Sequence, residues 1–90
     1  MSNKILIIDD EKTFARVLQF NLEETKKFKV RIEHSGLEAL RVALEFKPDI
    51  ILLDLMMPDM PGDKVAYQLR SHADTKNIPI ILLTSLVTEE

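Results

Sequence analysis

Short blocks of apolar residues alternate with amphipathic stretches along this chain. Three of the blocks are rich in Ile and Leu and lie at residues 5–8, 50–53 and 78–83. Apolar runs of this length are typical of strands in a parallel sheet that helices cover on both faces. A further block at residues 28–33 alternates apolar with charged side chains, which favours an edge strand with one face in water. The pattern therefore predicts four strands.

Apolar residues at helical spacing fill the stretches between the predicted strands. The first helix begins near Lys12, and its apolar face carries Phe14, Val17, Leu18, Asn21 and Leu22. Ser35 is placed to cap the amino end of a second helix, which Pro48 ends. A third helix is predicted from Asp63 to about Ala73. The order βαβαβαβ predicts a doubly wound α/β domain with right-handed crossovers between parallel strands.

Composition and charge narrow the class of protein. Ninety residues make one small domain at most, and a content of 46% hydrophobic and 30% charged residues is typical of a globular chain. The chain has no Cys, which excludes disulfides and thiolate chemistry and predicts a cytoplasmic protein. The apolar blocks are too short to span a membrane, and the amino-terminal residues lack the features of a signal peptide. A net charge of -3 argues against nucleic acid as a direct partner.

Polar residues gather where the predicted strands end. Asp9 and Asp10 follow the first strand, Asp54 follows the third, and Thr84 and Ser85 follow the fourth. In an open parallel sheet, ligands bind at the carboxyl ends of the strands. Carboxylates that meet there repel one another, and Mg²⁺ offsets the repulsion because it prefers oxygen ligands. Beside such a cation an aspartate can attack phosphorus, and a hydroxyl can bind the transferred phosphoryl group.

Three motifs identify a family that shares this arrangement. They are IIDDE at residues 7–11, LLDLMMPDMPG at residues 52–62 and IILLTS at residues 80–85. With all three at matching spacing, the chain resembles the receiver domain of two-component response regulators from about Lys4 onward. The resemblance implies a flavodoxin-like, doubly wound parallel sheet with strand order 2-1-3-4.

The resemblance also implies roles for individual residues. Asp54 would be the phosphoacceptor, and Thr84 would bind the phosphoryl group and move toward it as a switch. Mg²⁺ would be held by Asp9, Asp10, Asp54 and the backbone carbonyl of Met56, with Asp10 the more direct ligand and Asp9 acting largely through water. The implied phosphodonor is a sensor histidine kinase or a phosphotransfer protein in a phosphorelay. The domain would then be a phosphoacceptor and not an enzyme.

The resemblance stops at the fourth predicted strand. Receivers continue through a fourth helix, a fifth strand that carries an essential Lys, and a fifth helix, and this sequence offers no counterpart of them. Residues 1–90 are therefore expected to form a receiver domain that is incomplete at its carboxyl end, with weak or absent phosphorylation. The fourth strand would be an uncovered edge, which predicts a homo-oligomer that associates through that strand.

Two other functions fit parts of the pattern. A Mg²⁺-dependent phosphohydrolase of the haloacid dehalogenase type also uses an aspartate at the end of a strand. Its acid and base aspartate stands two residues after the nucleophile, where this chain has Met56, and the general acid is therefore missing. A non-catalytic module that self-associates through the incomplete sheet is the other alternative, and it is compatible with a receiver.

Each of these residues, taken alone, could also have a purely structural role. Asp10 could favour a helix amino end, Asp54 could cap a turn, and Thr84 could cap a helix. Their joint occurrence at the ends of the strands favours the site. The side chains of His34 and His72 are expected to lie in solvent. A local basic run is expected to be a solvated face and not a nucleic-acid surface: Lys26, Lys27, Lys29 and Arg31.

Overall fold

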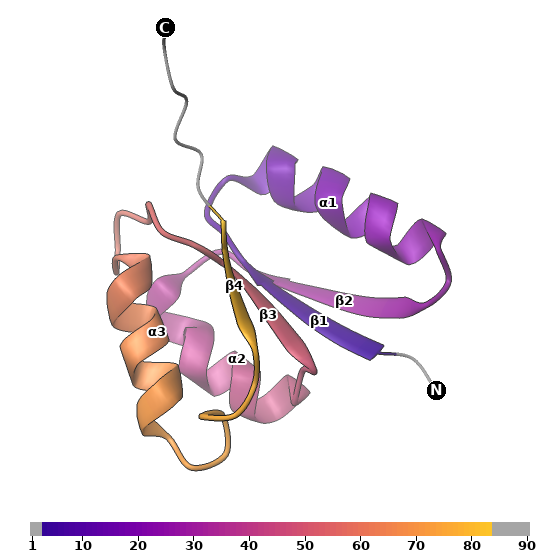
Figure 1. Cartoon of the computed structure of the whole chain (residues 1–90). Coiled ribbons are helices and arrows are strands. Elements are labelled where there is room, and N and C mark those ends of the chain that lie inside the picture. The colour runs from indigo at the N-terminus through magenta and orange to yellow at the C-terminus, as the bar shows by residue number, and fades with distance from the viewer. Residues whose placement is uncertain (1–2, 84–90) are drawn as a thin grey trace, which may run out of the picture.

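The computed structural model describes residues 3–83 as a four-stranded parallel sheet with helices on both faces (Figure 1). The strands lie in the order β2-β1-β3-β4, which is the flavodoxin-like order that the family resemblance implies. Within the described range, no counterpart is present of the fourth helix, fifth strand and fifth helix that receiver domains have. No helix in the described range is long and apolar enough to cross a membrane. In chain order the elements are β1 (Asn3–Ile8), α1 (Lys12–Glu24), β2 (Phe28–Glu33), the 3-10 helix η1 (Gly36–Glu38), α2 (Ala39–Phe46), β3 (Ile50–Asp54), α3 (Gly62–Ser71) and β4 (Ile80–Leu83).

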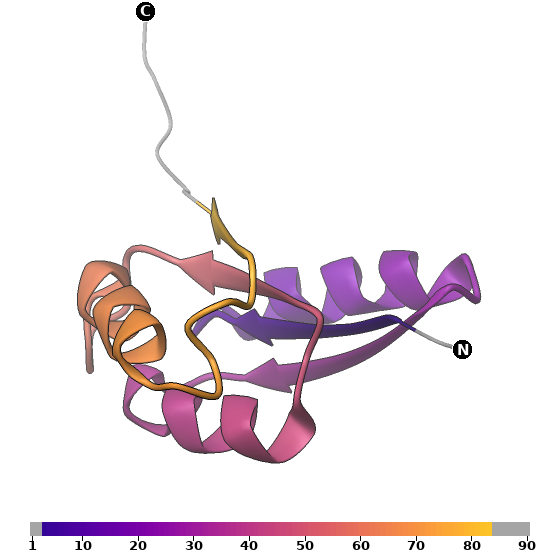
Figure 2. The ribbon, with the colours of Figure 1, turned by 60° about the horizontal axis from the view of Figure 1, so that its bottom comes forward.

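The two faces of the sheet carry separate hydrophobic cores. The turned view in Figure 2 shows α1 on one face and α2 with α3 on the other. Successive residues of a strand point to opposite faces. Ile5 and Ile7 of β1 accordingly pack with Ala15 of α1, whereas Leu6 and Ile8 belong to the larger core beneath α2 and α3. The central strands β1 and β3 are thus buried on both faces. Their packing fixes the backbone position of the residues that directly follow them.

Helix α1 packs only part of its predicted apolar face against the sheet. Ala15 is fully buried, and Leu18 and Leu22 are partly buried against the sheet. Phe14 and Val17 are instead 47% and 54% exposed. The buried residues recur at helical spacing and form a narrow stripe, and the two exposed residues lie outside that stripe. The predicted apolar face of this helix was therefore too wide.

Several helix ends differ from the predictions. Ser35 precedes η1, and its side chain makes no capping bond to that helix. Its hydroxyl donates instead to Asp59 Oδ2 at 2.6 Å. Helix α2 ends at Phe46, and the left-handed φ of 54° at Lys47 stops it before Pro48 is reached. Helix α3 ends at Ser71, two residues earlier than predicted.

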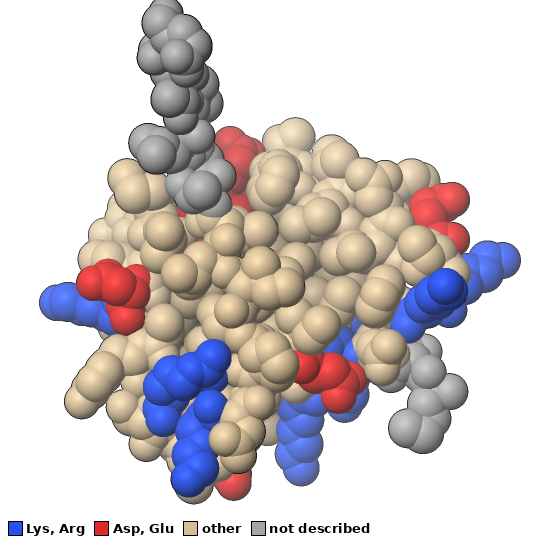
Figure 3. Space-filling model, viewed as in Figure 1, with Lys and Arg blue, Asp and Glu red and all other residues tan. Residues whose placement is uncertain are grey.

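Strand β4 is the less covered edge of the sheet. It begins after Pro79, two residues later than predicted, and its last residue, Leu83, pairs with Asp54 of β3. Ile81 and Leu82 are each 51% exposed. In Figure 3 the surface over β4 shows no charged side chains at its centre, and the charged residues lie around it. The described residues thus leave apolar side chains exposed on this strand, within a surface that carries no charge at its centre.

Candidate functional site

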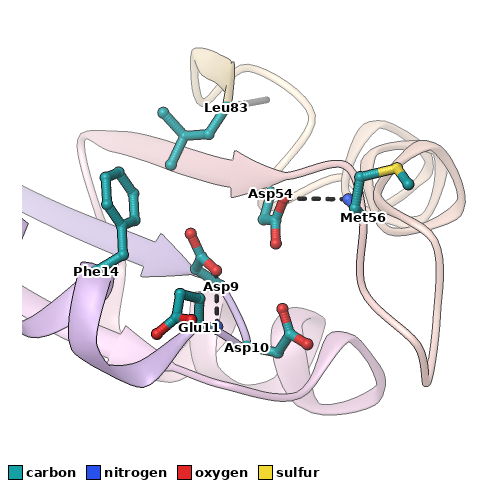
Figure 4. Close-up of a pocket in the computed structure, with 7 residues that line it drawn as sticks. All are labelled: Asp9, Asp10, Glu11, Phe14, Asp54, Met56 and Leu83. Carbon is teal, nitrogen blue, oxygen red and sulfur yellow. Dashed lines mark hydrogen bonds between the residues drawn. The ribbon is translucent and has the colours of Figure 1, made fainter. Parts of the chain in front are cut away.

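The carboxyl ends of β1 and β3 bring three carboxylates together. Asp9 and Asp10 directly follow β1, and Asp54 is the last residue of β3. Because the two strands are parallel neighbours, their ends meet at the same edge of the sheet. One carboxylate oxygen from each of the three residues lies within 4.8 Å of the others. Figure 4 shows the three side chains around one shared space.

Asp9 is the most buried carboxylate of the cluster. It is only 4% exposed, and its Oδ1 accepts a hydrogen bond from the Glu11 backbone N–H at 2.9 Å. Burial raises the pKa of the Asp9 carboxyl from 3.8 to about 6; the Glu11 N–H opposes this rise, and the neighbouring Asp54 and Asp10 carboxylates add to it. The site therefore carries an electrostatic cost that a bound cation would reduce.

Asp54 is held by the backbone that follows it. Its Oδ1 accepts the Met56 N–H at 3.1 Å. The Leu55 N–H donates to the Leu83 carbonyl at 3.2 Å, and the Leu55 carbonyl accepts the Gly62 N–H at 3.0 Å. A Cβ at Gly62 would lie 2.5 Å from the Asp54 carbonyl oxygen, so this close approach requires glycine. The Asp54 carboxylate consequently projects from a backbone that is anchored on two sides.

An open pocket of about 460 Å³ lies over the carboxylates. Four of its lining residues are acidic and three are apolar, namely Asp9, Asp10, Glu11, Phe14, Asp54, Met56 and Leu83. Within residues 3–83 no lysine or arginine lines this pocket. Several carboxylate oxygens around one open space make a donor set that suits a hard divalent cation such as Mg²⁺.

Comparison with known families shows where this arrangement belongs. The family described as the response regulator receiver domain matches residues 5–90. The chain belongs to this family. A similar curated protein, the transcriptional regulatory protein SrrA of Staphylococcus aureus, is 46% identical over 85 residues, which are 94% of this receiver and 34% of SrrA. The receiver thus spans about a third of the length of that relative.

Solved receiver structures share the fold of this receiver. The chemotaxis response regulator CheY4 of Vibrio cholerae superposes with a TM-score of 0.88 at 27% identity, and the match covers 98% of this chain and 72% of that one. The Mn(2+)-bound form of response regulator Rcp1 superposes with a TM-score of 0.81 at 29% identity, over 97% of this chain and 68% of that one. Both likenesses agree with the predicted fold.

The receiver brings together the three carboxylates that the sequence singles out. Asp9, Asp10 and Asp54 form one cluster, as expected from the strand order. Met56 lies beside them, with its backbone N–H on Asp54 and its side chain exposed; the role of its carbonyl as a metal ligand stays a prediction. Thr84 lies outside the described residues, and its role also stays a prediction.

The site contains one contact that contradicts a prediction and three lining residues that were not predicted as site residues, Glu11, Phe14 and Leu83. The expectation that His34 lies in solvent is wrong, because its ring Nδ1 is 2.9 Å from the Asp9 carbonyl oxygen. His34 directly follows β2, which pairs with β1, so the contact depends on strand pairing and not on the local sequence. Phe14 lines the pocket, although its spacing in the sequence indicated a place in the core.

Proposed function

We propose that this receiver domain accepts a phosphoryl group on Asp54, in a step that requires Mg²⁺, as part of a phosphorelay. The observation that carries the proposal is the close approach of Asp54 to Asp9 and Asp10 within an open pocket. The proposed donor is a sensor histidine kinase or a phosphotransfer protein. A net charge of -3 and an acidic pocket favour no direct nucleic-acid partner, and the cysteine-free sequence suits the cytoplasm.

Asp54 is the nucleophile of the proposed transfer. One of its carboxylate oxygens forms a bond to phosphorus while the bond between phosphorus and the donor's histidine nitrogen breaks. The electron pair of the broken bond leaves with the histidine, and the product is an aspartyl phosphate. The Met56 N–H on Asp54 Oδ1 orients the carboxylate for this attack. Because the transfer consumes the Asp54 carboxylate, the domain acts as a phosphoacceptor and not as a turnover enzyme.

The proposed Mg²⁺ ligands are Asp9, Asp10, Asp54 and the backbone carbonyl of Met56, with Asp10 binding directly and Asp9 largely through water. Carboxylate and carbonyl oxygens are the ligands that Mg²⁺ prefers. The raised pKa of Asp9 supports the proposal, because it reports a cost of uncompensated negative charge at this place. When bound, Mg²⁺ supplies positive charge that offsets the charge of the transferring phosphoryl group. Rcp1, a related receiver, has an Mn(2+)-bound form.

Thr84 is the residue that we propose to bind the phosphoryl group through its hydroxyl and to move toward it. The preceding residue, Leu83, lines the pocket and pairs with Asp54 across β3 and β4. Slow transfer is expected for this ninety-residue chain, since no lysine within residues 3–83 lines the pocket to pair with the phosphoryl oxygens.

Intact-mass spectrometry tests the proposed function. The protein is incubated with a small phosphodonor such as acetyl phosphate, with Mg²⁺ or with EDTA. We expect a slow, partial gain of one phosphoryl group with Mg²⁺, and none with EDTA or in Asp54→Asn. Asp74→Asn, which changes an exposed aspartate outside the pocket, is the matched control and should be modified like the wild type. An unmodified wild-type chain that still binds Mg²⁺ would contradict the proposal, and turnover of a phosphomonoester would support a phosphohydrolase instead.

We further propose that the ninety-residue chain self-associates through β4. The supporting observation is the half-exposed pair Ile81 and Leu82 on a strand that, within the described residues, pairs with β3 alone. Pairing with a second copy would bury this edge. Light scattering during size exclusion should therefore show a dimer or larger species, and Leu82→Lys should shift it toward monomer. A wild-type chain that is a stable monomer at high concentration would overturn this proposal.

A further inference from the structure

One carboxylate fastens the loop between β3 and α3 to a second loop, the segment between β2 and α2 that contains η1. Asp59 lies in the β3–α3 loop, and its side chain accepts four hydrogen bonds. The Ser35 hydroxyl and the Leu37 N–H donate to Oδ2 at 2.6 Å and 3.3 Å. The N–H groups of Gly36 and Met60 donate to Oδ1 at 3.3 Å and 2.9 Å. Three of these donors belong to the segment after β2, so Asp59 joins two loops that are distant in the sequence.

The two loops also pack tightly against each other at this junction. A Cβ at Gly36 would lie 3.0 Å from both the Cβ and the carbonyl oxygen of Met60, and 3.1 Å from Val65 Cγ2. Such distances are shorter than ordinary van der Waals contact, and the position therefore admits little more than a glycine. Asp59 itself is exposed, and its hydrogen bonds lie at the surface beside this packed contact.

The Asp59 carboxylate is stabilised in its ionised form. The Ser35 hydroxyl lowers the pKa of the Asp59 carboxyl below its ordinary value, and the N–H groups of Leu37, Gly36 and Met60 act in the same direction. Hydrogen bonds to an ionised acceptor are stronger than those between neutral groups. The junction is therefore held by charge-assisted hydrogen bonds at neutral pH.

The same loop carries Met56 next to the carboxylate cluster. Its base is closed by the Gly62 N–H on the Leu55 carbonyl at 3.0 Å, and its far side is held by Asp59. Met56 lies between these two fixed points, with its N–H 3.1 Å from Asp54 Oδ1. Asp59 itself does not line the pocket. Asp59 can therefore act on the site through the backbone of this loop, and not by direct contact.

We propose that Asp59 is a positioning residue, which holds the β3–α3 loop so that the Met56 backbone stays beside Asp54. The inference rests on the proposed function, since it concerns the ligands of the proposed cation. Loss of the Asp59 carboxylate leaves the loop anchored at its base and by the buried side chain of Met57, without the bonds to the segment after β2. The expected result is a fall in divalent-cation affinity of about tenfold, the scale seen when a group that orients a metal ligand is removed.

Titration with Mn²⁺, followed by electron paramagnetic resonance of the free ion, measures this effect. Asp59→Ala should lose about tenfold in affinity, whereas Asp59→Asn should retain most of it because the amide oxygen still accepts the Gly36 and Met60 N–H groups. Ser35→Ala, on the other loop, should lose less, and its effect should vanish in the Asp59→Ala background. Asp63→Ala removes the same charge from an exposed position in α3 and should bind like the wild type.

Hydrogen exchange of the Met56 amide in the metal-free protein gives a second readout that does not depend on the cation. Faster exchange is expected in Asp59→Ala and not in Asp63→Ala. Wild-type Mn²⁺ affinity in Asp59→Ala, or an equal loss in Asp63→Ala, would overturn the inference and leave the proposed function standing. A wild-type chain that does not bind Mn²⁺ would remove the proposed function and this inference together, while unchanged exchange in Asp59→Ala would remove the inference alone.

Discussion

Strands β3 and β4 contain the same four residues in the same order, Ile-Ile-Leu-Leu, but they are buried to different extents. Ile51 and Leu53 of β3 are fully buried, whereas Ile81 and Leu82 of β4 are each 51% exposed. β3 lies between β1 and β4. One of its faces packs in the core beneath α2 and α3, and the other packs in the core beneath α1. Within the described residues β4 pairs only with β3. Place in the sheet, and not intrinsic strand preference, therefore decides how much an apolar strand contributes.

The same difference separates the two halves of the candidate site. The acidic half stands on the buried strands, with Asp9 after β1 and Asp54 at the end of β3, and both residues are themselves nearly buried. The predicted hydroxyl half, at Thr84, follows the half-exposed strand β4. Cation binding should accordingly depend on the well-packed centre of the sheet, and phosphoryl binding should depend on what covers β4.

Matched truncations of register partners test the comparison most strongly. Leu53 of β3 lies opposite Leu82 of β4. Leu53→Ala removes a fully buried side chain and should lower the free energy of unfolding by about 2–5 kcal/mol. Leu82→Ala removes a half-exposed one and should cost about 1 kcal/mol or less. Urea denaturation of both variants gives the two values, and equal losses would contradict the comparison.

A methyl group at Gly62 tests how closely the end of β3 is covered. In Gly62→Ala the new Cβ would stand 2.5 Å from the Asp54 carbonyl oxygen and 2.6 Å from Leu55 Cα, so α3 must move away from the strand. We expect a loss of about 1–3 kcal/mol in the free energy of unfolding and weaker Mn²⁺ binding. Ser71→Ala, at the other end of α3, should change neither quantity appreciably. Unchanged stability in Gly62→Ala would show that the contact is loose.

A further effect is expected from pH, and it concerns the buried carboxylate after β1. Because the pKa of Asp9 is raised from 3.8 to about 6 in the folded, metal-free protein, the folded state keeps a proton that the unfolded chain releases between these values. The Asp9 contribution to stability is therefore lost as pH rises through this window. Asp9→Asn should be more stable than the wild type at neutral pH without metal, by an amount that shrinks toward pH 4.

Chemical denaturation at several pH values, with EDTA present, measures this difference between Asp9→Asn and the wild type. Asp63→Asn removes an exposed carboxylate and serves as the control, for which no such pH-dependent gain is expected. Added Mg²⁺ should stabilise the wild type, and the difference in stability between Asp9→Asn and the wild type should then shrink or change sign. A variant that is less stable than the wild type at neutral pH without metal would show that Asp9 is not penalised by its surroundings.

Much of the fold could be predicted because the pattern of apolar blocks fixes the strands and Asp and Pro residues mark their ends. The bounds of β2 agree with the prediction, and so does the carboxylate cluster at Asp9, Asp10 and Asp54. The clustering followed from strand order, which was taken from the family resemblance and not from the apolar pattern. Local periodicity together with a known topology was sufficient for these features.

Features that depend on tertiary contacts could not be predicted from the spacing of apolar residues. Phe14 and Val17 have helical spacing, but only the structure shows that the sheet contacts the neighbouring stripe of α1. Ser35 has the right chemistry for a helix cap, yet its hydroxyl bonds Asp59, which is 24 positions away in the sequence. His34 reaches the Asp9 carbonyl for the same reason, since the partner comes from another strand.

Mapping the phosphorylated residue is the most direct test of Asp54 as the Mg²⁺-dependent phosphoacceptor. The chain is incubated with Mg²⁺ and a small phosphodonor, and the product is reduced with borohydride, which converts an aspartyl phosphate to homoserine. Peptide mass spectrometry then locates the change. We expect homoserine at position 54 alone, and only when Mg²⁺ is present. Homoserine at position 9 or 10, modification at position 54 without any divalent cation, or no modification of a chain that binds Mg²⁺ would contradict it.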